Sequence, residues 1–123
     1  MTIIDAITQI DNLKKNTYSQ KQKIAWLSRL ESMVKRLVID THEGGENVTF
    51  GGFNENTDVQ TVLLMPEPFD QGYLYWLEAQ IHYANEDIDM YNSAIMMFNS
   101  AFSEYKADYK RNHASKGFGR FRF

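Results

Sequence analysis

The chain has 123 residues, of which 43% are hydrophobic and 24% charged. This size and composition fit one globular domain rather than two. The absence of cysteine excludes disulfide bonds, thiolate metal sites and cysteine nucleophiles, and it favours a reducing compartment. No apolar stretch is long enough to span a membrane, and the first residues lack the pattern of a secretory signal, so we expect neither.

The net charge of −3 hides an uneven distribution of charge along the chain. Residues 1–36 carry seven bases and three acids, residues 37–105 carry twelve acids and no base, and residues 106–123 carry six bases and one acid. Unlike surfaces on one chain favour head-to-tail assembly of identical subunits. A solvated acidic face is the alternative interpretation.

The first third of the chain predicts two helices. Thr2 precedes the apolar positions of a short amphipathic helix that ends near Lys14 or Lys15. Ser19 and Gln22 have the spacing of a capping box, and the helix behind them should run to about Thr41. Trp26 lies off the apolar stripe of this second helix, so it is either a core residue or an interface anchor.

Residues 42–69 form an irregular excursion between the helical halves. Two glycine pairs flank Val48 to Phe50, which predicts a long central loop or a short hairpin. Val59 to Met65 is an extended apolar run that Pro66 ends. A loop of this length within a small domain is usually functional or ordered by a partner.

The second half predicts a pair of antiparallel helices. Asp70 is the expected cap of the first, and residues 85–87 form either the turn between them or a kink in one unbroken helix. The second is long and amphipathic, with an apolar stripe of alternating steps of three and four: Ile88, Tyr91, Ile95, Phe98, Phe102, Tyr105 and Tyr109.

Residues 114–123 differ from the rest of the chain. Their phenylalanines and arginines suit an extended strand: Phe118, Arg120, Phe121, Arg122 and Phe123. Because three exposed phenylalanines are unfavourable in water, we expect this extended C-terminal arm to bind another molecule or to fold back on its own domain.

Reactive groups with the spacing of a known active site are missing. His42 opens the sequence HEGGE, in which Glu46 stands where a zinc protease needs its second histidine. Glu78, His82 and Glu86 share a helix face but lack the spacing of a carboxylate-bridged dimetal bundle. The glycine pairs do not fit a nucleotide loop. We therefore expect no catalysis, no cofactor and no metal.

The packing pattern resembles the helical head-to-tail connector, or adaptor, proteins of tailed bacteriophages. The similarity rests on KIAWLSRL at 23–30, on Val38-Ile39 before Thr41-His42, on Thr57-Asp58 leading into LLMPEPFD, and on the apolar positions of the predicted helix pair. It covers about residues 2–112 and consists of packing positions rather than a catalytic signature.

The resemblance implies an all-α, small helical bundle over residues 1–113 that assembles as a ring, dodecameric in many members, beneath the portal. The ring lies in the neck of the virion, extends the channel for double-stranded DNA without binding it specifically, and docks tail or stopper proteins; its subunits occupy the host cytoplasm during assembly. The C-terminal arm lies outside the stretch that carries the resemblance, and its composition is our reason to expect that Phe118, Arg120, Phe121, Arg122 and Phe123 contact the portal or a neighbour. The residues expected on the channel or loop surface are Glu43, Glu46, Glu55 and Asp58, and those at the subunit interface are Trp26, Lys35, Arg36, Glu86, Asp87 and Asp89.

Two other functions fit the sequence. A nucleic-acid-binding helical protein would use the basic aromatic tail to grip backbone and stack bases, although the acidic middle opposes this. A cellular helical adaptor would form a stable small assembly without rings.

Overall fold

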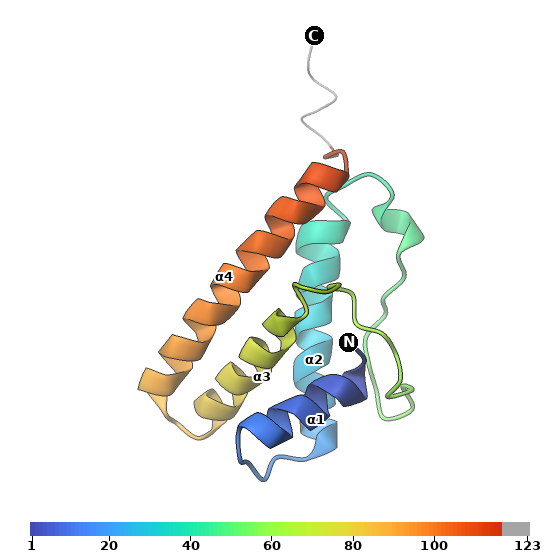
Figure 1. Ribbon diagram of the computed structural model, residues 1–123. Coiled ribbons are helices and arrows are strands. Elements are labelled where there is room, and N and C mark those ends of the chain that lie inside the picture. Colours follow the sequence, from blue (N-terminus) through green and yellow to red (C-terminus); the bar gives the residue numbers. More distant parts are fainter. Residues whose placement is uncertain (117–123) are drawn as a thin grey trace.

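The computed structural model describes residues 1–116, and residues 117–123 lie outside the described part. Four α-helices make up the described fold (Figure 1): α1 (Ile3–Leu13), α2 (Gln20–Val34), α3 (Gln71–Ala84) and α4 (Ile88–Asn112). A π-helical turn, η1 (Lys35–Ile39), continues α2, and a short 3-10 helix, η2 (Gly45–Asn47), follows it. No strand occurs in residues 1–116. The predicted all-α bundle is therefore confirmed.

Side-chain caps begin three of the four helices, two of them at residues that the sequence places directly before a helix, Thr2 and Ser19. The Thr2 hydroxyl accepts from the backbone N–H of Asp5, whose carboxylate accepts from the Thr2 N–H, so that α1 has a complete capping box. Ser19 accepts from the N–H of Gln22 at the start of α2. The prediction for Asp70 is wrong, because its side chain makes no cap bond and lies instead 3.7 Å from the Met1 amino group.

Helices α3 and α4 form an antiparallel hairpin, so the turn predicted at residues 85–87 is confirmed and the unbroken helix is excluded (Figure 1). Glu86 takes a left-handed conformation, with φ of 62°, that reverses the chain. The Asp87 carboxylate then accepts from the N–H of Met90, 3.3 Å away, and caps α4.

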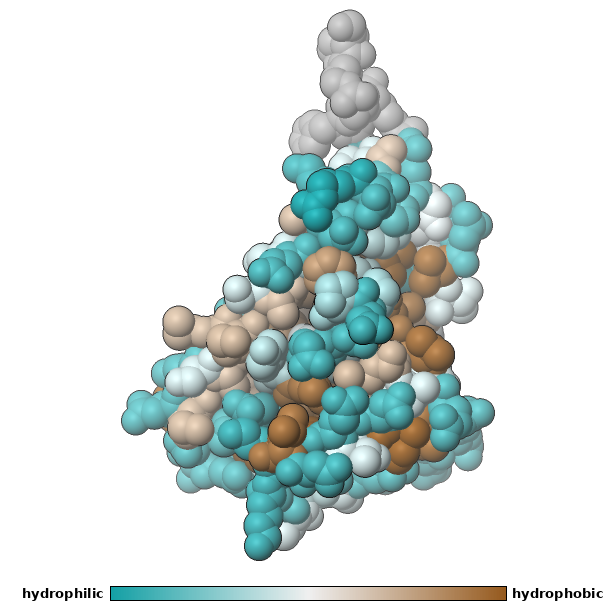
Figure 2. All heavy atoms as spheres, in the orientation of Figure 1, coloured by the Kyte–Doolittle hydropathy of each residue, from teal (hydrophilic) through white to brown (hydrophobic). Residues whose placement is uncertain are grey.

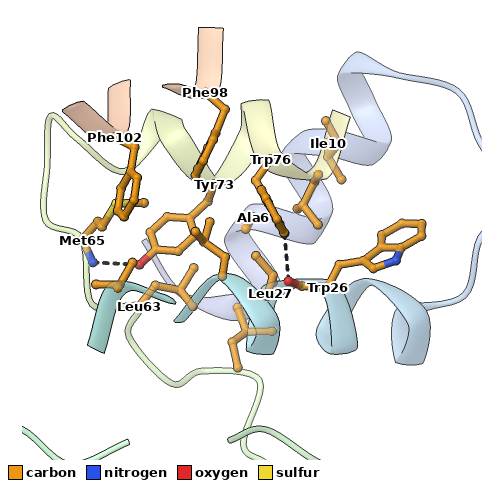
Figure 3. Close-up of a cluster of buried hydrophobic side chains, with 14 of the residues drawn as sticks. Ala6, Ile10, Trp26, Leu27, Leu63, Met65, Tyr73, Trp76, Phe98 and Phe102 are labelled. Atoms are coloured by element: carbon orange, nitrogen blue, oxygen red, sulfur yellow. Dashed lines mark hydrogen bonds between the residues drawn. The ribbon is translucent and has the colours of Figure 1, made fainter. Parts of the chain in front are cut away.

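The core lies where α1, α2 and α3 meet, with α4 covering α3 (Figure 1). The Trp76 indole N–H donates to the Trp26 carbonyl over 2.9 Å, which ties α3 to α2 (Figure 3). The Phe98 ring lies 5.1 Å from Trp76, and Phe98 and Phe102 stack on each other. Aromatic pairs of this geometry stabilise a core beyond their burial alone.

The ends of the predicted stripe on α4 are less buried than its middle. Phe98, Phe102 and Tyr105 are buried, as expected, whereas Ile88 is 54% exposed. Ile88 is the first residue of α4 and directly follows the turn, so it lies at the very end of the helix pair.

The central excursion is a loop, and the predicted hairpin does not form: Val48 to Phe50 contains no strand. The loop runs down one side of the bundle beside α2 (Figure 1), where the Phe53 N–H donates to the Ser28 hydroxyl over 3.0 Å. Its last part pairs briefly with the start of the chain, through a bridge between Thr2 and Val62. Leu63 and Met65 are buried in the core.

Candidate interaction surfaces

The predicted arm begins later than the sequence suggested. Residues 114–116 are paired with residues 41–43: the N–H of Glu43 donates to the Ala114 carbonyl over 2.7 Å, and the N–H of Lys116 donates to the Thr41 carbonyl over 3.0 Å. An antiparallel bridge joins His42 and Ser115 between these bonds. The first three residues of the predicted arm therefore belong to the domain.

An aromatic stack supports this attachment. The Tyr109 ring lies 3.8 Å from the His113 ring, nearly parallel to it, and 5.1 Å from His42. His42 is buried, and its Nδ1 lies 2.7 Å from the Val38 carbonyl oxygen. The chain therefore leaves the described domain at a fixed place, the junction of η1 and the C-terminal end of α4. The described residues do not include those predicted to bind the portal or a neighbour, namely Phe118, Arg120, Phe121, Arg122 and Phe123.

The four acidic residues predicted to share a channel or loop surface fall into two separate groups. Glu43 and Glu46 are exposed beside residues 114–116, and Glu46 forms an ion pair with Lys116 at 3.4 Å. Hydrogen bonds from its own backbone and from Lys116 hold the pKa of Glu46 below its usual value. Glu55 and Asp58 are exposed further along the loop, with no helix between them. All four side chains are on the surface.

The residues predicted at the subunit interface differ in how far they are exposed to solvent. The interface prediction for Trp26 is wrong: it is only 6% exposed and packs edge-on against Tyr18. Its place off the helical stripe reflects a wide buried face of α2. Lys35 is partly buried and donates to the Gly45 carbonyl as well as pairing with Asp40. Arg36 is exposed.

At the opposite end of the molecule, Glu86, Asp87 and Asp89 are exposed in the α3–α4 turn and the first turn of α4. Asp87 also caps α4. The three acids therefore remain accessible to a partner.

Folding partly neutralises the charge segregation of the sequence. Lys14, from the basic first segment, lies 3.6 Å from Glu78 of the acidic middle, and Lys116 of the basic last segment pairs with Glu46. The end of the molecule next to residues 117–123 is strongly hydrophilic on the face shown in Figure 2, whereas hydrophobic side chains reach the surface further from it. Part of the charge that the sequence separates is therefore paired within the subunit.

The outer surface of α4 is unusual for a helix that faces water. From residue 90 to residue 103 the chain contains no charged residue. Three methionines on this stretch are exposed, by 41% at Met90, 70% at Met96 and 51% at Met97, and the side chains between them are mainly serine and asparagine. Exposed helix faces normally carry charged residues. Depletion of charge and enrichment of methionine are typical of the centre of a protein interface.

An open groove of about 500 Å³ lies between α2 and the central loop. Its helical wall is formed by Gln20, Lys21, Ile24 and Ala25, and its loop wall by Phe53, Asn54 and Glu55. The lining surface is mainly apolar and includes one base, Lys21, and one acid, Glu55. A volume in this range suits a small ligand or a few side chains of a peptide.

A buried polar network, which the sequence did not predict, lies between α2, the loop and α3. Glu31 is 1% exposed; its carboxylate accepts hydrogen bonds from the Tyr73 hydroxyl and from the Leu64 N–H. The Met65 N–H in turn donates to the Tyr73 oxygen over 2.7 Å (Figure 3). Burial raises the pKa of Glu31 to about 7 although both hydrogen bonds oppose the change. The only signal in the sequence is an acid one residue after the apolar position Leu30.

Among residues 1–116, no group of three or more His, Asp or Glu side chains is arranged to hold a metal ion. His82 lies 3.9 Å from Glu78, while Glu86 is in the turn beyond α3. No helix within this part combines the length and apolar character that a bilayer crossing requires. Comparisons with protein-family models, with curated proteins and with solved structures give no match.

Proposed function

We propose that this chain is a subunit of a ring-forming connector in the neck of a tailed bacteriophage, between the portal and the tail or stopper proteins. The observation that carries the proposal is the outer surface of α4, which is uncharged from residue 90 to residue 103 and exposes three methionines. Such a surface is suited to burial against another protein.

The packing positions that carry the resemblance support the proposal. Leu27 and Leu30 of the α2 segment, Met65 of the loop, and Tyr73 of α3 all lie in one hydrophobic cluster. A helical bundle built around these positions is what the connector family would require. In this proposal the bundle is a scaffold, and its outer surfaces bind the portal and neighbouring subunits rather than catalyse a reaction.

The exposed acids fit a ring through which DNA passes. Asp58 on the loop would face the channel, where negative charge repels phosphate and lets double-stranded DNA slide without specific binding. Glu86 and Asp89, at the far end of the molecule, would meet exposed bases of a neighbour such as Arg36. The assembled protein would belong to the virion, and free subunits to the host cytoplasm.

Co-sedimentation with the portal protein encoded in the same genome tests this function. The 14.4 kDa chain is expected to move into the fast-sedimenting portal fraction, and Met96→Glu, which places a charge in the middle of the α4 surface, is expected to prevent this. Asn12→Glu, an exposed substitution on α1, is the control. Salt-dependent binding to short DNA without portal binding would instead support the nucleic-acid alternative.

A further inference from the structure

We propose that the groove between α2 and the central loop receives residues 117–123 of a second copy of this chain. The inference rests on the proposed function, since it names the contact that would link neighbouring subunits of the ring. Its basis is the chemistry of the groove, the place where the described chain ends, and the distance between the two.

The chemistry of the groove matches that of the segment. Ile24, Ala25 and Phe53 are the apolar residues of its lining, and Glu55 is its acidic residue. Residues 117–123, GFGRFRF, contain three phenylalanines, two arginines and no acid. Phenylalanine side chains fill apolar hollows, and arginine pairs well with a carboxylate. Lys21 on the opposite wall favours a peptide that places its arginines on the Glu55 side.

The position of Lys116 makes the segment's own groove a poor target. Lys116 is bonded to Thr41, beyond the end of η1, whereas the helical residues that line the groove, Gln20 to Ala25, belong to the first turns of α2. The path from Thr41 back to Ala25 along the helical axis is roughly 23 Å. An extended chain gains about 3.4 Å per residue, so the backbone of Phe121 reaches only about 17 Å from Lys116. Even with the segment fully stretched, Phe118 could not arrive, so the segment's own groove could not receive all three phenylalanines.

A second copy removes this restriction. The groove and the departure point of the segment lie at opposite ends of α2, so an arm that leaves one subunit enters the far end of the next. Such a contact joins different surfaces of the two copies. Contacts of this kind generate closed rings or open filaments rather than symmetric dimers.

The absence of cysteine in the chain allows a direct test with full-length protein. Two singly substituted chains, Ala25→Cys on the groove wall and Gly119→Cys in the segment, are mixed at high concentration under mild oxidation. Gly119→Cys keeps all three phenylalanines, and Ala25 is exposed. The control pairs Gly119→Cys with Gln22→Cys, an exposed position of the same helix that does not line the groove. Mass spectrometry of the linked peptides measures each mixed disulfide.

The Ala25–Gly119 disulfide is expected to exceed the control disulfide by roughly tenfold, because docking raises the effective concentration of the two thiols. Excess peptide GFGRFRF should suppress it. Equal yields for both pairs would overturn the inference. So would rapid intramolecular closure in a dilute chain that carries both cysteines, since that would place the segment in its own groove. A specific disulfide in a chain that fails to bind portal would support the inference while refuting the proposed function; portal binding without the disulfide would do the reverse.

Discussion

Tyr73→Phe tests whether the buried polar network holds the loop against the helices. The substitution removes one hydroxyl and leaves the ring, so the packing of the core is kept. Tyr73 is fully buried, and its hydroxyl both donates to Glu31 and accepts from the Met65 N–H. Without it, the Met65 N–H and one carboxylate oxygen lose their partners.

The expected cost follows from these two bonds. A neutral hydrogen bond contributes about 1 kcal/mol net, a bond to a charged group about 1.5 to 3 kcal/mol, and a buried group left without a partner costs more than the bond alone. The free energy of unfolding should therefore fall by about 3 kcal/mol, a large part of the roughly 5 to 15 kcal/mol of a typical domain. For a chain of this size the melting temperature should fall by about 10 °C.

Urea unfolding followed by tryptophan fluorescence and by circular dichroism measures this change. Trp26 and Trp76 are both buried, so their emission reports the core. Tyr83→Phe, at a position that is 63% exposed, is the matched control and should leave stability unchanged. If Tyr73→Phe unfolds at the same urea concentration as the parent, the hydroxyl does not hold the loop and the reasoning about the network fails.

Three further substitutions test the account of the fold. Burial raises the pKa of Glu31 to about 7 in the folded protein. The stability that this group contributes is therefore fully present below its pKa in the unfolded chain and is lost as the pH rises through 7. From this group alone, the free energy of unfolding of the parent should fall by about 3 kcal/mol between pH 4.5 and 8. In urea titrations at several pH values, the free energy of unfolding of Glu31→Gln should fall less steeply with pH. An equal fall in both proteins would contradict the raised pKa of Glu31. Gly45→Ala should destabilise by about 1 to 3 kcal/mol, because an added Cβ would lie 2.4 Å from the Ile39 carbonyl oxygen, while Gly51→Ala, with open space around it, should be neutral; similar melting temperatures for the two variants would refute this. Phe98→Ala should lower the free energy of unfolding by about 3 to 5 kcal/mol, and Met96→Ala should change it little, because Phe98 is 2% exposed and Met96 is 70% exposed. Equal melting temperatures for the two variants in calorimetry would contradict this placement of α4.

Local signals in the sequence predicted the helices well. Thr2 and Ser19 precede helices whose free N–H groups need acceptors, and each supplies one. The apolar period of α4 identified Phe98 and Phe102 as core residues, which they are. These features depend on residues close together in the chain, and this is why a single sequence was sufficient.

The features that failed or were missed depend on contacts between distant segments. Trp26 is a core residue on a part of α2 that faces α3, from which the Trp76 indole N–H reaches the Trp26 carbonyl, and no local period encodes that contact. Glu31 is buried because donors arrive from the loop and from α3. Residues 114–116 belong to the domain because they pair with residues 41–43. The groove likewise exists only because the loop returns to α2.

The most direct test of the central claim is electron microscopy of purified portal rings mixed with an excess of this chain. The portal should be the one encoded in the same genome. The proposed connector function predicts an additional ring of density beneath the portal, with one small helical subunit in each repeat and a central channel continuous with that of the portal. Portal rings that remain unchanged at saturating concentrations of the chain would contradict it.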